Sequence, residues 1–474
     1  MKKPEFLKKI KHVHFTGIKG VGMTALACCL QDLGIKISGS DIEEIFVTDK
    51  VLKQRKIPWK VGFSEKNLTP KPDLVITTGA HGGLTNPEVV AATEMKIPVL
   101  THAQALGKMM EGKEGISVCG VGGKTTTASM IATVLEKAGR KPSYAIGVGE
   151  IFPLGAPGKY SNGLEFVAEA DEYANSPGTD NRPRFSFQNP KIIVVTNIEY
   201  DHPDVYRDLN HTKEVFSDFF KKIPKDGLLV ACADNKNTLG VAKKFPKVLQ
   251  TYGFSPQADW QITKTYFGQG QTIFRLQHRG VVIDEIKIRV PGRFNILNAT
   301  AAFAVGTFLG INAQTIKKGL EEFWGTKRRF EFVGAVRGVR VYDDYAHHPT
   351  EIRQVLLAAK QWFPQERILV VFQPHTYSRT KALFSEFSRA FAGTNIVIIT
   401  EIYASAREKD DLGINGKMLA EETAKHHPRV VYEPGEKGVV EFLRKETQPG
   451  DVIITMGAGS IFLWHKNILK SLKN

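Results

Sequence analysis

The chain of 474 residues is too long to form one hydrophobic core, so we expect two to four domains. With 42% hydrophobic and 24% charged residues the composition is typical of a globular protein, and no stretch approaches the roughly 20 apolar residues of a membrane span. The net charge of +15 indicates either a basic solvated surface or anionic partners, and since no RNA- or DNA-binding signature is present we expect nucleotides or phosphorylated small molecules and no nucleic acid.

The chain starts with MKKPEFLKKIKHVHF, in which no apolar run is long enough for a signal peptide, so we expect a cytoplasmic protein. The four cysteines form no C-x-x-C pair, and the sequence therefore predicts neither a zinc knuckle nor a disulfide framework. The same stretch runs into the first predicted strand, KHVHFTGI (11–18), which ends in glycines.

The first hundred residues continue as alternating strands and helices. We expect helices over 23–34, where a glycine closes the pattern, and over 86–96, which Asn-Pro opens. Strands are expected over 35–41 and 72–80. This alternation is typical of a parallel, doubly wound sheet, and we assign residues 1–110 to this domain.

The glycines of GIKGVGM (17–23) follow the first strand and open the first helix, where backbone N–H groups can bind a pyrophosphate. The dinucleotide fingerprint G-x-G-x-x-G requires glycine at position 19, but Lys19 stands there. Gly17, Gly20 and Gly22 remain as candidates for the anion site, and Asp41 lies at the distance along the chain that suits a ribose contact. By itself this pattern has little specificity.

A polar break at 111–115 separates a second α/β domain, expected over 111–326, from the first. A third begins near KRRFEFVG and is expected over 327–474. The predicted fold class is therefore α/β, with three domains in series, each built on a mainly parallel sheet. The strands that we expect in these two domains are apolar runs at 164–171, 191–197, 227–234, 339–347, 367–375, 394–400 and 451–460.

The stretch VCGVGGKTTT (118–127) ends in the Gly-Lys-Thr of a phosphate loop, but Val118 stands where the strict G-x-x-x-x-G-K-[ST] pattern has its first glycine. The pattern alone leaves open a shorter nucleotide loop or a glycine-rich turn. A strand before it and a predicted helix over 126–139 favour the nucleotide loop. In that case Lys124 would contact the terminal phosphates, and the hydroxyl of Thr125 would reach a Mg²⁺ ion.

Acidic residues follow two neighbouring strands. VAEADEY (167–173) ends in Glu169, Asp171 and Glu172, which could hold a metal ion or form a solvated turn. VVTNIEYDHPD (194–204) carries His202 beside further acids, where the histidine could bind a second metal ion, contact a substrate phosphate or be structural.

Several motifs in one order along the whole chain make the sequence resemble the Mur ligases, the ATP-dependent amide-forming enzymes of peptidoglycan precursor synthesis. In that family the short G-x-x-G-K-T loop is the expected form, so the resemblance implies that Gly120 begins a nucleotide loop. It also implies a UDP-sugar-binding domain, a central ATP-binding domain and a C-terminal amino-acid-binding domain. The motifs are EADE (169–172), TNIEYDHPD (196–204), GRFNILNATAA (292–302), KRRFE (327–331), DDYAHHPTEI (343–352) and FQPHTYSRT (372–380).

The ends of the chain resemble the branch of the family that joins L-alanine to UDP-N-acetylmuramic acid. The central DNRPRF (180–185) and the proline at 190 are instead similar to the recycling branch, which adds the tripeptide L-Ala-γ-D-Glu-diaminopimelate to the same sugar. Because the C-terminal domain selects the amine in this family, the resemblance implies L-alanine, with the tripeptide as the alternative. It implies ATP as a substrate, Mg²⁺ or Mn²⁺ as the cofactor, an acyl phosphate intermediate, and a monomer or dimer.

The resemblance also implies roles for individual residues. Lys124, Glu169, His202 and Arg328 would be catalytic, with Thr125, Glu169 and His202 on the metal and His347, His375 and Arg379 on the amino acid. Arg329 is the alternative to Arg328 and His348 the alternative to His347. Gly17, Gly20, Gly22 and Asp41 would bind the UDP-sugar. The implied ATP-binding residues are Gly120, Gly122, Gly123, Lys124, Thr125, Thr126, Asn295, Arg328 and Asp343.

Two positions depart from the family pattern. Lys19 replaces a glycine and could add a charge contact to the diphosphate, while Phe294 replaces the histidine of G-x-H-N and leaves Asn295 in place. The rival functions are a NAD-dependent oxidoreductase, which Lys19 disfavours, a P-loop switch, which would not need three domains, and a polyglutamate ligase, which lacks the N-terminal domain.

Overall fold

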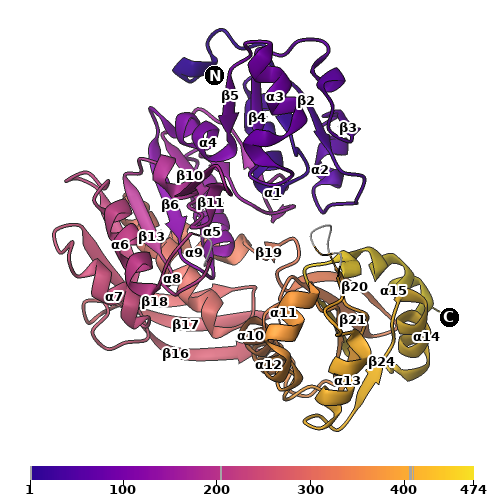
Figure 1. Cartoon of the computed structure of the whole chain (residues 1–474). Coiled ribbons are helices and arrows are strands. Elements are labelled where there is room, and N and C mark those ends of the chain that lie inside the picture. The colour runs from indigo at the N-terminus through magenta and orange to yellow at the C-terminus, as the bar shows by residue number, and fades with distance from the viewer. Residues whose placement is uncertain (1–2, 203–204, 269, 405–407, 409, 474) are drawn as a thin grey trace. The chain divides into compact units, whose positions relative to one another are not determined.

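The computed structural model describes residues 3–202, 205–268, 270–404, 408 and 410–473 (Figure 1). Two compact units make up the chain, and each is described by itself. Among the described residues no helix is long and apolar enough to cross a membrane. Unit 1 consists of Met1–Thr265, Ile273–Ile288 and Phe294–Lys327, and unit 2 consists of Tyr266–Thr272, Arg289–Arg293 and Arg328–Asn474.

The N-terminal part of unit 1 is a five-stranded parallel sheet in the order β3-β2-β1-β4-β5. Successive side chains of a strand point to opposite faces, and both faces are covered here. Leu74 and Ile76 of β4 pack with α1 and α4, whereas Val75 between them packs with α3. The strands are β1 (His12–Thr16), β2 (Lys36–Asp41), β3 (Trp59–Val61), β4 (Leu74–Thr77) and β5 (Val99–Thr101).

Side chains cap two of the helices that cover this sheet. The Asn86 side chain accepts a hydrogen bond from the backbone N–H of Glu88 at the start of α3, and Thr101 and Gln104 form a capping box at the start of α4. The helix α3 therefore begins where Asn-Pro predicts a start, whereas the sequence patterns did not predict α4. The helices of this part are α1 (Val21–Asp32), α2 (Asp49–Gln54), α3 (Pro87–Glu94) and α4 (His102–Met110).

The second sheet of unit 1 has ten strands in the order β18-β17-β16-β15-β14-β13-β6-β10-β7-β9. The pairs from β16 through β7 are parallel. The sequence patterns did not predict β16, β17 and β18. The strands are β6 (Glu114–Cys119), β7 (Ser143–Ala145), β9 (Gly158–Lys159), β10 (Glu165–Glu169), β13 (Ile192–Val195), β14 (Leu228–Cys232), β15 (Leu249–Gly253), β16 (Trp260–Gly268), β17 (Gln271–His278) and β18 (Val281–Ile288).

Helices and two small sheets complete unit 1. Aromatic side chains of α6, among them Phe216 and Phe220, pack on the buried strands β13 and β14. The helices are α5 (Lys124–Lys137), α6 (Leu209–Phe220), α7 (Lys236–Ala242), α8 (Arg293–Phe308) and α9 (Ala313–Glu322). The small sheets pair β8 (Ile151–Phe152) with β19 (Gly325–Thr326), and β11 (Ala174–Ser176) with β12 (Asp180–Pro183).

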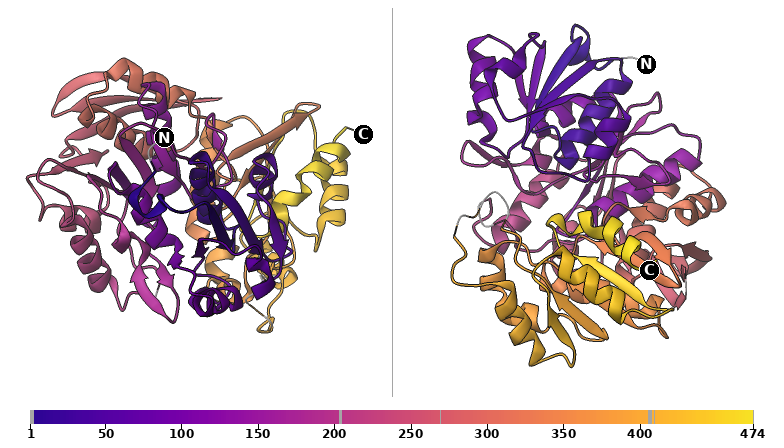
Figure 2. Two further views of the ribbon diagram at one scale, coloured as in Figure 1. Left: turned by 90° about the horizontal axis from the view of Figure 1, so that it is seen from above. Right: turned by 90° about the vertical axis from the view of Figure 1, so that its right-hand side faces the viewer.

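Unit 2 contains a six-stranded sheet in the order β20-β21-β25-β22-β23-β24, in which only the β20–β21 pair is antiparallel. Helices flank both faces of the sheet (Figure 2). The adjacent residues Leu369 and Val370 of β22 point to opposite faces, and each belongs to a different hydrophobic cluster. The strands are β20 (Glu331–Val336), β21 (Val339–Asp344), β22 (Ile368–Phe372), β23 (Ile396–Ile399), β24 (Val430–Tyr432) and β25 (Val452–Met456). The helices are α10 (Pro349–Trp362), α11 (Tyr377–Ala382), α12 (Phe384–Ser388), α13 (Gly416–Ala424), α14 (Glu436–Glu446) and α15 (His465–Ser471).

The predicted fold class, three α/β domains built on mainly parallel sheets, is confirmed. The boundaries at 110/111 and 326/327 stay predictions. The predicted strand over 164–171 ends at Glu169 in the structure, so Asp171 and Glu172 lie in the connection that follows β10. Acidic side chains therefore lie beyond the carboxyl edge of the sheet, where parallel α/β sheets place ligands.

Candidate active site

The phosphate loop connects β6 to α5 in unit 1. Gly120 and Gly123 have φ values of 118° and 86°, a region that side chains other than glycine rarely adopt. A Cβ atom at Gly120 would lie 2.3 Å from Oγ1 of Thr196, and one at Gly123 would lie 2.7 Å from Oδ1 of Asn298. The loop conformation therefore requires glycine at both positions.

Residues that follow β13 hold this loop. The Asn197 side chain accepts a hydrogen bond from the backbone N–H of Gly122 at 2.9 Å. The hydroxyl of Thr196 donates to the carbonyl of Gly122 at 2.6 Å. Our sequence reasoning assigned neither residue to the site, although TNIEYDHPD was recognised as a motif, because a supporting role depends on which strands are neighbours. β13 pairs directly with β6, which places its end beside the loop.

Lys124, the first residue of α5, forms a buried ion pair. Its Nζ lies 2.9 and 2.8 Å from the two carboxylate oxygens of Glu172 and donates to the carbonyl of Gly120 at 2.8 Å. Burial opposes the charge of Lys124, but the Glu172 and Asp171 carboxylates outweigh it and raise the pKa of the ammonium. Burial likewise opposes ionisation of Glu172, and Lys124 and His202 lower its pKa. The cation that the sequence places at the phosphates is thus neutralised by a carboxylate of the same unit.

Glu169 ends β10 and contacts the hydroxyl expected to reach a metal ion. Thr125 donates through Oγ1 to one Glu169 oxygen at 3.0 Å, and the backbone N–H of Gly147 donates to the other at 2.7 Å. Burial and the neighbouring Asp171 raise the pKa of Glu169 to about 7. A positive charge placed here would favour the ionised form.

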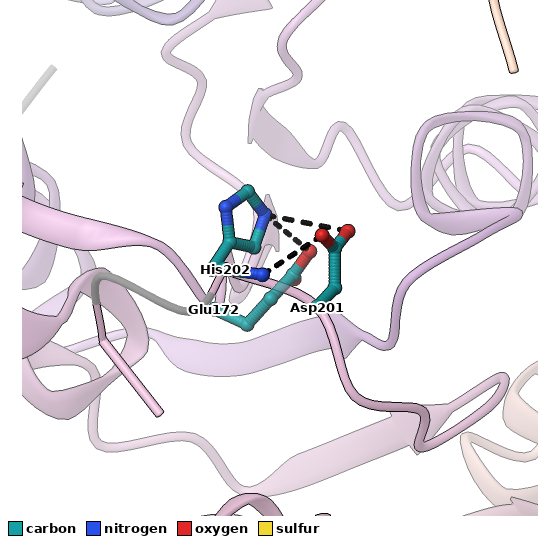
Figure 3. Close-up of side chains that lie close together, drawn as sticks. All are labelled: Glu172, Asp201 and His202. Carbon is teal, nitrogen blue, oxygen red and sulfur yellow. Dashed lines mark hydrogen bonds and ion pairs between the residues drawn. The ribbon is translucent and has the colours of Figure 1, made fainter. Parts of the chain in front are cut away.

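His202 lies with two carboxylates rather than with Glu169 (Figure 3). Its Nε2 is 3.7 Å from Oε1 of Glu172 and 3.6 Å from Oδ2 of Asp201. One ligand atom from each of the three side chains lies within 4.8 Å of the others, and oxygen and imidazole donors suit a divalent cation such as Mg²⁺ or Mn²⁺. The residues therefore fit a metal ion. The last two residues of the 196–204 motif lie outside the described residues.

The N-terminal glycine loop lies between β1 and α1. Both carboxylate oxygens of Asp41 accept backbone hydrogen bonds, from Lys19 at 2.7 Å and from Ile42 at 2.8 Å. Asp41 thus fixes the backbone of this loop and of the residue that follows β2. Its contact with a ribose stays a prediction. Gly20 is the residue before α1, and a Cβ atom at Gly17 would lie 2.5 Å from Cγ2 of Thr78.

The Lys19 side chain has partners inside the protein. It is 2% exposed, donates to the carbonyl of Glu44 and lies 3.8 Å from the Asp49 carboxylate, with the ring of Phe46 5.1 Å away. The lysine therefore fixes the segment after β2, and a charge contact with a diphosphate stays a prediction. A glycine in its place would lose these contacts.

A cavity of about 70 Å³ lies beside the N-terminal glycine loop. Its lining includes Gly22 at the start of α1, His102 at the start of α4, and Glu169, Asp171 and Tyr173 at and after the end of β10. The cavity therefore joins the N-terminal glycine loop to the acidic edge beside the phosphate loop, within one compact unit.

The start of α8 also reaches the phosphate loop. Asn298 accepts a hydrogen bond from the Thr127 hydroxyl at 3.0 Å and donates to Oδ1 of Asn295 at 3.1 Å. Asn295 is thus one helical turn from a residue that contacts the loop, which suits its expected place near the nucleotide. Its own contact with ATP stays a prediction, and Phe294 is half-buried beside it.

Arg328 and Asp343 are paired inside unit 2. The guanidinium donates through Nε to Oδ2 of Asp343 at 2.8 Å and through Nη1 to the carbonyl of Gly459 at 3.3 Å. The side chains are 5% and 0% exposed. Burial opposes the Asp343 charge, but Arg328 and His465 lower its pKa to about 2. Contacts of these two residues with ATP stay predictions, and the neighbouring Arg329 is exposed.

The three residues expected at the amino acid lie close together in unit 2. Nη1 of Arg379 is 3.2 Å from Nδ1 of His375, whose ring centroid is 6.2 Å from that of His347. Burial outweighs the nearby Glu351 and lowers the pKa of His347, which favours a neutral imidazole. His348 instead caps α10. The structure therefore brings these three side chains together, and their role at the amino acid stays a prediction.

Comparisons with known proteins match the chain in three segments. The model described as "Mur ligase family, catalytic domain" matches residues 12–114. "Mur ligase middle domain" matches 118–306, and "Mur ligase, glutamate ligase domain" matches 328–459.

Relatives and solved structures extend these matches to nearly the full length. The UDP-N-acetylmuramate–L-alanine ligase of Acetivibrio thermocellus is 42% identical over 466 residues, which cover 98% of this chain and 96% of that protein. The ligase of the same name from Geobacter sp. strain M21 is 40% identical, with 98% of each chain covered. The crystal structure of a UDP-N-acetylmuramate–alanine ligase from Thermotoga maritima superposes with a TM-score of 0.80 at 27% identity, covering 98% of this chain and 99% of that one. A murein peptide ligase from Psychrobacter arcticus has the same fold, with a TM-score of 0.69 at 23% identity and the same coverage.

Proposed function

Because this chain belongs to the Mur ligase family, we propose that it joins L-alanine to UDP-N-acetylmuramic acid in an ATP-dependent step of peptidoglycan precursor synthesis. The observation that carries the proposal is the cavity lined by both Gly22 and Glu169. An acid anchored on the N-terminal glycine loop would meet there the terminal phosphate of ATP bound at Lys124. The relatives' names supply the identity of the two substrates.

In the first step the lactyl carboxylate of the sugar attacks the γ-phosphorus of ATP. The new carboxylate–phosphorus bond replaces the bond to ADP, which leaves as an anion, and an acyl phosphate forms. Two anions meet in this step, so it depends on positive charge and alignment more than on covalent help. Lys124 supplies charge at the phosphates once they replace Glu172 as its partner, and the backbone N–H groups from Gly120 to Thr126 complete the cradle.

A divalent cation, Mg²⁺ or Mn²⁺, belongs to this proposal. Thr125 and Glu169 would hold it on the phosphate side, and His202 with Glu172 and Asp201 would hold a second ion. When bound, such ions neutralise phosphate charge as it develops. Glu169 binds in its ionised form, which its raised pKa makes available only in part near neutral pH unless a cation is present.

In the second step the amine of L-alanine attacks the acyl carbon. The amine loses a proton, the carbon–nitrogen bond forms and phosphate leaves. Arg379 binds the alanine carboxylate, because a guanidinium matches a carboxylate in shape and charge. His375 orients Arg379, and the neutral His347 is suited to accept the amine proton. Asn295 contributes to nucleotide binding, and Arg328 with Asp343, or the exposed Arg329, is the third-domain contact to ATP.

The test measures ADP and phosphate formation with UDP-N-acetylmuramic acid, ATP and Mg²⁺, one amine at a time. We expect turnover with L-alanine well above that with L-Ala-γ-D-Glu-diaminopimelate, and none with Lys124→Met. A preference for the tripeptide would overturn the choice of amine, and no turnover with either amine would overturn the function. We expect the enzyme to act in the cytoplasm. We also expect it to be a monomer or a dimer, and light scattering on the purified chain would distinguish these two states.

A further inference from the structure

We propose that His102 and Arg184 form the subsite for the carboxylate of the UDP-sugar acid, with His102 as the contact and Arg184 as the positioning charge behind it. The two side chains are 82 positions apart and meet where Nη1 of Arg184 lies 3.5 Å from Nδ1 of His102. The inference rests on the proposed function and assigns the part of the substrate that occupies the cavity.

His102 lines the cavity, and one of its ring nitrogens has no hydrogen-bond partner among the described residues. Its side chain is buried, and burial and the neighbouring Arg184 lower its pKa to about 3 against the backbone of Gly22, which raises it, so the imidazole stays neutral. Because a guanidinium only donates, Nδ1 must accept from Arg184, so the proton is on Nε2. Nε2 is buried and has no hydrogen-bond partner among the described residues, and a Cβ atom at Gly22 would lie 2.9 Å from it.

Arg184 is a partly buried cation without a counter-ion. It donates through Nη1 to the Tyr173 hydroxyl at 3.1 Å, and its Cζ lies 4.5 Å from the centre of the Tyr173 ring. Within the described ranges no carboxylate forms an ion pair with it, and its buried Nε has no partner. Unpaired buried donors cost free energy, so the two together indicate an acceptor that the chain itself does not supply.

The cavity can hold a carboxylate. A volume of about 70 Å³ has room for a group of a few heavy atoms, and a carboxylate is such a group. Glu169 and Asp171 also line the cavity, so an anion there needs a cation close by, and Arg184 meets this need through its contacts with the lining residues His102 and Tyr173. A carboxylate held there lies beside the acidic edge at which the proposed phosphoryl transfer takes place.

The chain offers a matched control two residues away. Arg182 is exposed and already pairs with Asp180 at 2.8 Å, so it has a counter-ion where Arg184 has none. His102→Gln retains an N–H donor, whereas His102→Ala removes it. These variants separate the loss of a specific donor from a general disturbance of the segment.

The experiment compares two ligands by calorimetric titration without ATP. UDP-N-acetylmuramic acid carries the carboxylate, and UDP-N-acetylglucosamine has the same nucleotide and sugar without it. We expect Arg184→Gln and His102→Ala to weaken binding of the acid roughly 10- to 100-fold, the range for a lost charge-assisted hydrogen bond, and to change binding of the neutral sugar less than about threefold. Arg182→Gln should match the wild type for both ligands, and His102→Gln should retain most of the affinity.

Equal losses for both ligands would overturn the assignment and place these residues at the diphosphate or in the general support of the fold. Unchanged affinity for the acid in both variants would also overturn it. Neither result bears on the proposed function. The function is tested by whether the wild-type chain turns over ATP with the acid and L-alanine. A wild type without turnover rejects the function, while a preference of the wild type for the acid over the neutral sugar that both variants lose supports the subsite.

Discussion

Two buried carboxylates of unit 1, Glu88 and Glu169, have opposite effects on stability. Glu88 lies at the carboxyl edge of the first sheet and accepts hydrogen bonds from Thr16, Ser40 and Asn67 at 2.6 to 2.7 Å. Glu169 has one N–H and one hydroxyl donor and an acidic neighbour. The first carboxylate is stabilised in its ionised form, and the second is not.

Glu88→Gln should therefore destabilise the protein in a pH-dependent way. Burial opposes ionisation, but the contact with His14 at 3.3 Å and the three hydrogen bonds outweigh it and lower the pKa of Glu88 to about 2. Since the folded pKa lies below the unfolded value, the stabilisation is complete above about pH 4.5 and is lost as the pH falls towards 2. We expect a loss of about 3 kcal/mol in the free energy of unfolding at pH 7 and a smaller loss at pH 3, measured by urea denaturation. Glu94→Gln, on the exposed face of the same helix, is the control, and an equal loss at both pH values would contradict the argument.

Glu169→Gln should have the opposite effect on the ligand-free protein. The folded pKa of about 7 lies above the unfolded value, so this carboxyl lowers stability progressively as the pH rises from about 4.5, and the loss is complete above about pH 7. We expect the variant to melt at a higher temperature than the wild type at pH 8.5 and not at pH 5, and to lose at least about 100-fold in turnover. A variant that melts lower at pH 8.5 would show that the Thr125 and Gly147 hydrogen bonds outweigh the burial of the charge.

At the scale of elements, the strand–loop–helix units of unit 1 could be predicted and the contacts between them could not. Runs of β-branched residues followed by glycine predicted β1, β6 and the helices after them, because local patterns determine where such elements start. The pairing of Arg184 with His102 joins segments 82 positions apart and has no local signal. The Lys124–Glu172 ion pair escaped prediction for the same reason: both residues were candidates, but their contact depends on β6 and β10 being neighbours.

The phosphate loop should tolerate a side chain at one glycine and not at the next. Gly123→Ala combines a positive φ with a Cβ atom 2.7 Å from Asn298, whereas a Cβ atom at Gly122 would have nothing nearer than 4.0 Å. We expect Gly123→Ala to cost about 1–3 kcal/mol in stability and to raise the KM for ATP, with Gly122→Ala close to wild type in stability. Thermal melts and ATP titrations measure both, and equal losses in the two variants would show that the loop conformation is not what requires glycine.

Across the whole molecule, the two compact units contain separate parts of the proposed reaction. Unit 1 contains the phosphate loop, the N-terminal glycine loop and the cavity, while unit 2 contains His347, His375 and Arg379. Sequence motifs located both groups because each motif is continuous along the chain. The motif KRRFE was harder to interpret, since it places one buried and one exposed arginine side by side.

Arg328→Ala should lower the stability of unit 2 and leave unit 1 intact. The change would leave the fully buried Asp343 without its guanidinium partner. Breaking such a buried pair typically costs about 3–5 kcal/mol. We expect a lower calorimetric transition for unit 2, with binding of UDP-N-acetylmuramic acid by unit 1 unchanged. Arg329→Ala should change stability by less than about 0.5 kcal/mol, and a raised KM for ATP in this variant would identify Arg329 as the phosphate contact. Equal melting behaviour of the two variants would contradict the structural role of Arg328.

The ion pair between Lys124 and Glu172 also makes the occupancy of two neighbouring positions interdependent. A nucleotide that takes Lys124 away from Glu172 leaves that carboxylate uncompensated, with Asp201 and His202 beside it. A divalent cation restores the balance, so the cation should bind more tightly after the nucleotide, and the nucleotide more tightly after the cation, by the same factor. Because Glu172 neutralises Lys124, inorganic phosphate without a cation should bind only weakly at this loop, even in a chain of net charge +15.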